Sequence, residues 1–203
     1  MTEYEKMIQG QLYDPNVKEI MDMQFPFLDG LREFNETKDS EVGKKEAYMK
    51  RVFAECGENN YIQPPFYANW GGHHVHLGNN VYANFNLTCV DDGHIYIGDR
   101  VMIGPNVTIA TAAHPVDPAL RAKNLQYNRD VTIGENAWIG ANVVILPGVH
   151  IGKNAVIGAG AIVTKDVPDN CVAVGNPCRV LREVTERDRE YFYKDEKVSE
   201  EYL

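Results

Sequence analysis

The sequence predicts an all-β solenoid, a parallel β-helix with a small helical cap at its N-terminal end and a helix at its C-terminal end. Two observations lead to this fold class. A six-residue hydrophobic period runs from Ile97 to Pro168, and turn-forming residues recur at one place in each repeat. Repeats are interpreted before any other feature, because they decide the architecture of the whole chain.

Each repeat begins with isoleucine or valine and has valine or alanine at its fifth position. Alternate strand residues face the same side, so the fifth residue and the first residue of the next repeat point inward together. The sixth residue, between them, points outward. The first positions are Ile97, Ile103, Ile109, Ile133, Ile139, Ile145, Ile151, Ile157 and Val163, and the fifth positions are Val101, Val107, Ala113, Ala137, Val143, Val149, Ala155, Ala161 and Val167.

The fourth position of most repeats is asparagine or glycine, the residues that tolerate positive φ in a tight turn. A short strand and a turn in every repeat give a three-sided coil of about 18 residues, and stacked coils bury one continuous aliphatic column. These fourth-position residues are Asn106, Asn136, Asn142, Gly148, Asn154 and Gly160.

The period divides the chain into a helical cap over 1–58, a β-helix over 59–184 and a C-terminal helix and tail over 185–203. Residues 115–130 hold two prolines and mixed charge and do not fit the period, so we expect a loop that leaves the coil. How the coils stack across this loop stays open.

Apolar spacing predicts a short first helix near Tyr4 to Leu12. Asp14-Pro15 is expected to open a second helix that Pro26 ends or kinks, and Ser40 to cap a third that runs to Cys56. The coil is expected to begin loosely at Val75. After it, Thr185 resembles the cap of a surface helix that continues toward Leu203.

Composition excludes several classes of partner. The formal net charge is −9, which argues against nucleic acid and anionic membrane surfaces. No apolar run approaches membrane-spanning length, and the N-terminus is acidic and unlike a signal peptide. The cysteines Cys56, Cys89, Cys171 and Cys178 show no CxxC pairing, so we expect reduced thiols and a cytoplasmic protein.

His114 is the first candidate for catalysis. It stands at the outward sixth position of its repeat, beside the start of the expected loop. A histidine held outward on a rigid strand next to a loop suits a general base. The alternative is a surface histidine with no role.

Three other groups are candidates on weaker grounds. His73, His74 and His76 could bind zinc, although no third converging ligand is identifiable, and core or surface roles are the alternative. Asp91 and Asp92, with Asn84 upstream, could hold a hydroxyl-rich ligand or form a solvated turn. Lys165, Arg179 and Arg182 could hold phosphates or be ordinary surface charges.

Several outward sixth positions are apolar. Exposed apolar side chains on a regular face indicate an interface, and a three-sided column with such a face favours closure into a trimer. These residues are Met102, Trp138, Val144, Val156 and Ile162.

The repeats resemble the left-handed parallel β-helix of the hexapeptide-repeat acyltransferases, and the hand of the coil follows from this resemblance alone. More specific motifs are similar to the galactoside and maltose O-acetyltransferase group and cover nearly the whole chain. They are Leu12-Tyr-Asp14, Tyr82-Ala-Asn-Phe-Asn86, Val90-Asp-Asp92, His114-Pro115, Gly158-Ala-Gly-Ala-Ile-Val-Thr-Lys165 and Gly175-Asn-Pro-Cys-Arg-Val-Leu-Arg182.

The resemblance implies a homotrimer with active sites between subunits, which uses acetyl-coenzyme A to acetylate a sugar hydroxyl without a metal. It implies that His114 is the general base. It places the hydroxyl acceptor at Asp14, Asn69, Asn84 and Asp92, and coenzyme A at Ala141, Ala159, Thr164, Lys165, Arg179 and Arg182.

The acceptor itself stays open, because the chain departs from the group around Asn69 to His73 and over Met23 to Phe27. Another small alcohol or an antibiotic is one alternative. A zinc hydratase of the carbonic anhydrase type is another, but it needs histidines about five residues apart, and Ala119 and Leu120 follow His114 at that spacing. A binding scaffold without catalysis is the third.

Overall fold

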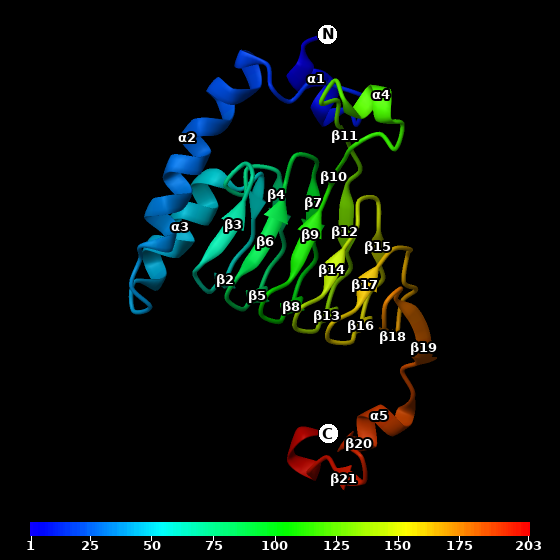
Figure 1. Ribbon diagram of the computed structural model, residues 1–203. Helices are drawn as coiled ribbons and strands as arrows, with labels where there is room; N and C mark the ends of the chain where they lie inside the picture. The colour runs from blue at the N-terminus through cyan, green and yellow to red at the C-terminus, as the bar shows by residue number, and fades with distance from the viewer.

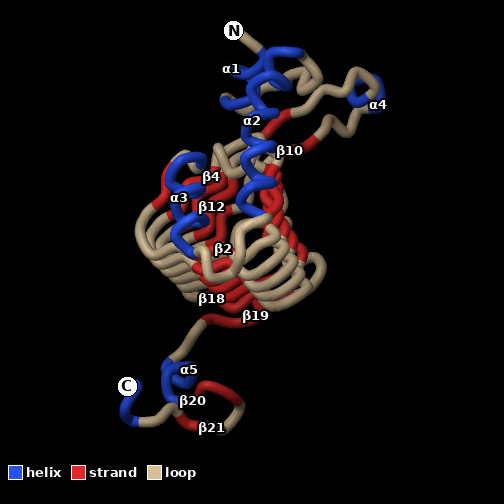
Figure 2. Tube along the Cα trace, turned by 90° about the vertical axis from the view of Figure 1, so that its left-hand side faces the viewer, coloured by secondary structure: helices blue, strands red, loops and turns tan.

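Three sheets of parallel strands wind around one apolar column (Figure 1). A computed structural model describes residues 1–203. Figure 2 looks along the stack and shows its three-sided outline. The first sheet holds β1 (Glu55–Cys56), β4 (Val75–Leu77), β7 (Ile95–Ile97), β12 (Val131–Ile133) and β15 (His150–Ile151). The second holds β2 (Tyr61–Ile62), β5 (Tyr82–Ala83), β8 (Met102–Ile103), β13 (Trp138–Ile139), β16 (Val156–Ile157), β18 (Cys171–Val174) and the antiparallel β19 (Arg179–Glu183). The third holds β3 (Phe66–Ala68), β6 (Leu87–Val90), β9 (Thr108–Ala110), β14 (Val144–Ile145) and β17 (Ile162–Val163).

The repeat positions behave as the period predicts. The first positions of the repeats are buried, and so are the fifth positions except Ala113, which is half-buried. The predicted turn residues all have positive φ, from Asn142 at 57° to Gly148 at 82°. Alternation of inward aliphatic residues with outward residues therefore builds the column, and asparagine or glycine turns it.

Glycine at the second position of a repeat lets neighbouring coils approach. A Cβ on Gly140 would lie 2.6 Å from the amide nitrogen of Ala159 in the next coil. One on Gly104 would lie 2.8 Å from the nitrogen of Ala141. Since these neighbours are backbone atoms, a side chain at either glycine would push two coils apart.

Asparagine side chains link the turns of successive coils. Asn86 Nδ2 donates to Asn106 Oδ1 at 2.9 Å, and Asn106 Nδ2 donates to Asn142 Oδ1 at 3.2 Å. A second ladder joins Asn136 to Asn154 at 2.9 Å and Asn154 to Asn170 at 2.8 Å. Both ladders lie at exposed turns and connect side chains that are aligned by the backbone register.

The coil resumes in register after the long loop. Ile133 pairs with Ile97, and Trp138 pairs with Met102. Residues 115–130 therefore lie outside the stack, and the stacking phase that the sequence left open is set. β10 (Ala112–Ala113) and β11 (Tyr127–Asn128) pair antiparallel at the base of this loop, and α4 (Pro118–Arg121) lies at its tip.

Helices α2 (Lys18–Asn35) and α3 (Val42–Val52) cover the N-terminal end of the stack, and α1 (Glu3–Ile8) packs beside α2 and β11 (Figure 1). The short first helix is confirmed, but the bounds predicted for the other two were wrong. The helix α2 begins at Lys18 rather than at Pro15, and it continues through Pro26. Pro26 lies on the exposed side, where water can satisfy the carbonyl that loses its N–H partner.

The third helix is shorter than predicted at both ends. Its N-cap is Glu41 rather than Ser40, and it ends at Val52, because Phe53 takes an extended backbone with ψ of 148°. Phe53 is buried and packs against Phe66. Cys56 lies in β1, which pairs with β4, so the coil begins a full turn before Val75. The strand β1 thus falls within 1–58, the range assigned to the cap.

The C-terminal segment forms a separate arm. Thr185 caps α5 (Glu186–Glu190) in a capping box with Asp188, as its sequence indicates. The expected long helix is wrong, because the chain turns into a hairpin of β20 (Tyr191–Tyr193) and β21 (Glu196–Lys197) and ends in the 3-10 helix η1 (Glu200–Tyr202). Both views show this arm standing clear of the coils (Figures 1 and 2).

No helix has both the length and the apolar composition needed to cross a bilayer. The four cysteines are free thiols. Cys89 and Cys171 are buried and fill small inward positions.

Candidate active site

The polar candidates gather at one of the three corners of the coil. We call the turns from the first to the second sheet the first corners, those from the second to the third sheet the second corners, and those from the third sheet to the next coil the third corners. First and second corners are tight turns through asparagine or glycine at positive φ in most coils. The third corners of the first three coils are polar and differ in length from one another, and cover 69–74, 91–94 and 111–130.

His114 follows β10 at the third corner and is exposed, as its outward position predicts. Its Nδ1 lies 2.9 Å from the carbonyl oxygen of Leu125. A carbonyl can only accept, so in the neutral ring the proton sits on Nδ1. Nε2 then keeps its lone pair and can accept a proton from a substrate.

Asp92 lies at the third corner of the preceding coil and is only 7% exposed. Its Oδ2 accepts from Asn69 Nδ2 at 2.8 Å, and its Oδ1 accepts from Gln126 Nε2 at 3.2 Å. Burial raises the pKa of this carboxyl, and the two amide donors oppose that rise. The buried Trp70 Nε1 makes no well-formed hydrogen bond but lies near enough to lower the same pKa.

The neighbouring Asp91 holds the backbone of the loop and does not face the other candidates. It is fully buried, and it accepts from the backbone nitrogens of Trp70 at 2.7 Å and Gly72 at 3.0 Å. Burial raises its pKa to about 7. Asp91 therefore shapes the loop that presents Asn69, and of the acidic pair only Asp92 lies beside the other candidates.

Asp14 reaches this corner through the residue before it. The backbone of Tyr13 exchanges two hydrogen bonds with Gln126, each of 2.9 Å. The hydroxyl of Tyr13 also accepts from Gln126 Nε2. Asp14 is half-buried next to this bridge, with its Oδ1 accepting from the backbone of Asn16 at 2.9 Å. Asn69 and Asp92 thus share one hydrogen-bonded cluster with Gln126 and Tyr13, whereas Asp14 and His114 adjoin it only through Tyr13 and the carbonyl of Leu125.

Asn84 lies elsewhere in the same chain. It is at a second corner, after β5, and the strand β6 separates it from Asp92. Strand residues rise by about 3.3 Å, so Asn84 and Asp92 lie beyond opposite ends of a four-residue strand that is itself about 13 Å long. Ala141 and Ala159 lie on the same side as Asn84, at second corners of adjoining coils.

The basic candidates lie at the C-terminal end of the coil. Thr164 and Lys165 are exposed at a third corner, and Arg179 is exposed on β19. Arg182 already holds both carboxylate oxygens of Asp188, each at 2.7 Å, and this pairing lowers the pKa of Asp188. The charge of Arg179 is free of carboxylate partners, whereas that of Arg182 is shared.

Sequence reasoning missed Gln126, Tyr13 and Asn128, which are all buried at the joint of the N-terminal segment and the long loop. Asn128 Nδ2 donates to the carbonyl of Met7 at 3.1 Å. The loop breaks the period, so no repeat position marked these residues. For Gln126 and Asn128 the only signal was their polar type shortly before the coil resumes at Val131, and Tyr13 was marked only as part of the motif Leu12-Tyr-Asp14.

The histidine cluster makes bonds within the protein. His74 Nδ1 lies 2.6 Å from the carbonyl of Asp91, and His76 Nε2 lies 2.8 Å from His94 Nδ1. His73 stacks on Phe27 with ring centroids 4.2 Å apart. No set of three His, Cys, Asp or Glu side chains is arranged to hold a metal ion.

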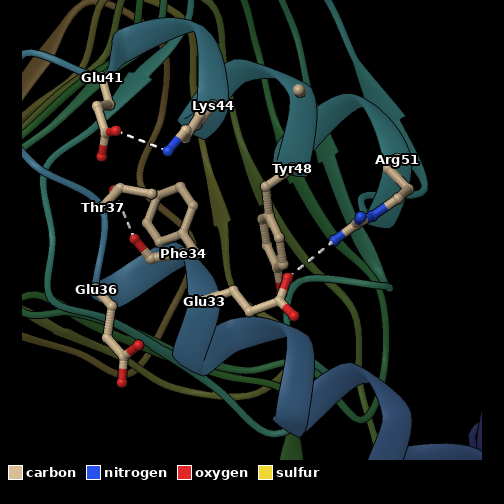
Figure 3. A pocket seen from close by; sticks show the side chains of 9 residues that line it. Glu33, Phe34, Glu36, Thr37, Glu41, Lys44, Tyr48 and Arg51 are labelled. Carbon is tan, nitrogen blue, oxygen red and sulfur yellow. Dashed lines mark hydrogen bonds and ion pairs between the residues drawn. The ribbon is translucent and has the colours of Figure 1, made fainter.

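A hollow also opens between α2 and α3 (Figure 3). It is lined by Phe34, Tyr48 and charged side chains that pair with one another, such as Glu41 with Lys44 at 2.7 Å. None of the candidate residues lines it, and it holds no histidine or cysteine. We therefore place the chemistry at the third corner and not in this hollow.

Two family models match the chain. Residues 130–165 match the bacterial transferase hexapeptide (six repeats), and residues 6–57 match the maltose acetyltransferase hexapeptide capping motif. The galactoside O-acetyltransferase of Lactococcus lactis is 50% identical over 91% of this chain and 89% of its own length. The enzyme of that name from Escherichia coli is 51% identical over 82% of this chain and 81% of its own.

A solved structure described as galactoside acetyltransferase in complex with coenzyme A superposes with a TM-score of 0.93. It is 47% identical, and the match covers 98% of this chain and 99% of that one. The hexapeptide repeat and this superposition confirm the left hand of the predicted β-helix.

Proposed function

The chain belongs to the hexapeptide-repeat acetyltransferases of the galactoside and maltose group, and from this premise we propose that it acetylates a sugar hydroxyl with His114 as general base. It is an O-acetyltransferase that uses acetyl-coenzyme A. The acceptor is a galactoside, maltose or glucose-type sugar. Four free thiols suit a reducing compartment, and we assign the enzyme to the cytoplasm.

The observation that carries this proposal is the tautomer of His114. Its Nδ1–H donates to Leu125, so Nε2 is free to act. Nε2 takes the proton from the acceptor hydroxyl as the oxygen attacks the thioester carbonyl carbon. The tetrahedral intermediate then expels the coenzyme A sulfur as the C–S bond breaks, and the imidazolium returns the proton to that sulfur. Holding both substrates in line supplies a further part of the acceleration.

The acceptor side consists of Asp14, Asn69 and Asp92 of one chain, with Asn84 supplied by a neighbouring copy. Carboxylate oxygens and an amide offer several acceptors and donors within one cluster, which is what a ring of hydroxyl groups requires. Asn69 already holds Asp92 at 2.8 Å, so the pair presents a fixed edge to the sugar. The coenzyme side consists of the corner residues Ala141 and Ala159 with the charged group Thr164, Lys165, Arg179 and Arg182, whose cations suit phosphates.

We assign the enzyme as a homotrimer because one chain alone leaves its site divided. Asn84 is distant from Asp92 within the chain, so a neighbouring copy must supply it. The outward apolar residues also fall on two faces rather than on the single face expected: Met102 and Trp138, both about half exposed, are on the second sheet, and Val144 and Ile162 are on the third. Two different apolar faces that pack together in successive copies close into a ring.

An acceptor screen with the His114→Ala variant tests the proposal. Thiol release from acetyl-coenzyme A is measured against galactosides, maltose, glucose, other small alcohols and antibiotics. Loss of a general base lowers kcat/KM by about 10²–10⁴-fold. His150→Ala is the matched control, since His150 is also exposed but lies on the first sheet. Equal turnover by His114→Ala and wild type contradicts the role of the base. Turnover with antibiotics alone contradicts the assignment of a sugar as the acceptor.

A further inference from the structure

Gln126 lies between the acceptor carboxylate of Asp92 and the segment that holds the base His114. It is 8% exposed and lies where the long loop returns to the coil. Its Nε2 has two hydrogens, and its nearest acceptors are the hydroxyl of Tyr13 and, at 3.2 Å, Oδ1 of Asp92. Both protons are therefore committed, one to the N-terminal segment and one to the acceptor carboxylate.

The backbone of the same segment holds the base. Leu125, the preceding residue, carries the carbonyl that lies 2.9 Å from His114 Nδ1. Tyr127 and Asn128, the following residues, pair with Ala113 and Ala112, which come immediately before His114. A short stretch of chain thus fixes the imidazole through its backbone and the carboxylate through a side chain.

We infer that Gln126 is a positioning residue for the proposed acetyl transfer: its side-chain amide aims Asp92 at the acceptor in a fixed relation to His114. The inference rests on the proposed function, since it assigns Asp92 to the acceptor. Neither the six-residue repeat nor the position of His114 alone predicts a role for Gln126.

The electrostatics of Asp92 explain why a donor is needed. Burial favours the neutral acid; the amide donors of Asn69 and Gln126 oppose it, and so does the nearby Trp70 Nε1, although it makes no well-formed hydrogen bond. The titratable groups around it are Asp91 beside it in the chain and Tyr13 from the N-terminal segment. Neither supplies a positive charge. Without the Gln126 amide, Asp92 binds a proton at higher pH and then accepts fewer hydrogen bonds from a hydroxyl.

Two variants separate positioning from packing. Gln126→Leu removes both donors while a buried side chain of similar size remains. We expect kcat/KM to fall about 10–100-fold, as for loss of a hydrogen bond to a charged group. Gln126→Glu keeps the shape, but its carboxyl donates only while protonated. The activity of Gln126→Glu relative to wild type at the same pH should therefore recover as the pH is lowered from 8 to 6, whereas that of Gln126→Leu should not.

A direct titration keeps this test independent of turnover. The carboxyl carbon of Asp92, followed by ¹³C NMR without any substrate, should titrate at higher pH in Gln126→Leu than in wild type. Gln9→Leu, an exposed glutamine outside the cluster, is the matched control and should change neither readout. An unchanged titration of Asp92 in Gln126→Leu, or a ratio for Gln126→Glu that does not vary with pH, overturns the inference. If no acceptor is turned over at all, the proposed function fails while the titration still decides the role of Gln126.

Discussion

The first and second corners of the coil differ from the third corners in almost every respect. The former are tight turns that repeat from coil to coil, with Asn106 and Asn136 at φ of 59° and Asn142 at 57°. The latter change length in each of the first three coils and hold buried Asp91, Asp92 and Gln126. The candidate base His114 and the acceptor residues Asn69 and Asp92 lie at the third corners. Repetition therefore specifies the scaffold, and departures from repetition locate the chemistry.

The irregular corners remain ordered because polar bonds replace the lost repeat contacts. Thr111 illustrates this: its hydroxyl donates to the carbonyl of Val90 at 2.6 Å and accepts from the backbone of Gly93 at 2.8 Å. Asp130 Oδ1 accepts from the backbone of His94 at 2.9 Å. Buried polar groups that are satisfied in this way fix one conformation, which a catalytic site needs.

The largest expected effect on stability lies in the regular column. Ile139→Ala removes a fully buried side chain between adjoining coils. We expect the free energy of unfolding to fall by about 2–5 kcal/mol, because the column cannot collapse around the cavity. Urea denaturation measures it. A loss below about 1 kcal/mol would mean that neighbouring coils adjust freely, against the rigid scaffold described above.

The next effect concerns activity. Asp92→Ala should lower kcat/KM for the acceptor about 10²-fold, since the acceptor loses its fixed partner and its alignment with His114. Asp99→Ala is the matched change at a first corner, where Asp99 Oδ1 accepts from the backbone of Asn79 at 2.7 Å. Its kcat/KM should stay that of the wild type. Similar losses of kcat/KM in both variants would show that the first and third corners do not differ in function.

A smaller effect is expected at the regular turns. Asn142 has φ of 57°, a conformation that costs alanine about 1–2 kcal/mol. Asn142→Ala should lower the free energy of unfolding by that amount, and Asn142→Gly should lower it less because glycine adopts this φ without strain. Thermal denaturation of the pair measures the difference. Equal losses would show that the side-chain ladder, and not the backbone, sets the cost.

A further effect is a pH dependence of stability at the irregular corner. Burial raises the pKa of Asp91 to about 7, so the folded state holds this proton more tightly than the unfolded state. The resulting stabilisation, about 4 kcal/mol for this rise in pKa, is complete below about pH 4 and is lost as the pH rises toward 7. Urea midpoints from pH 4 to 8 test it. Asp91→Asn cannot ionise and should have a flatter profile; parallel profiles for both proteins would contradict the assignment.

Sequence reasoning succeeded where one rule applies many times. The aliphatic positions and the positive-φ turns follow from strand alternation and backbone sterics, so the coil from Ile97 to Val163 could be predicted closely. It failed where a single event overrides the local pattern. Phe53 ends α3 early because its ring packs against Phe66, and β1 starts the coil early because β4 is there to pair with it. Neither partner is near in sequence.

The site could be predicted only in part for the same reason. His114 stood out because the period places it outward beside a break. Gln126 and Tyr13 did not, because a contact between residues 13 and 126 follows from how the loop folds over the N-terminal segment. The tautomer of His114 likewise depends on Leu125, a residue whose type carries no information about its carbonyl.

The asparagine ladders have a consequence for how such a chain can change in length. Asn136 and Asn154 are 18 residues apart and lie one above the other. Each hydrogen bond of the ladder therefore requires only an asparagine at the same turn of the next coil. A duplicated coil placed between two existing ones would inherit a bond above and a bond below without altering either. The scaffold can therefore grow or shrink by whole modules while the irregular corners, and the reaction they serve, keep their shape.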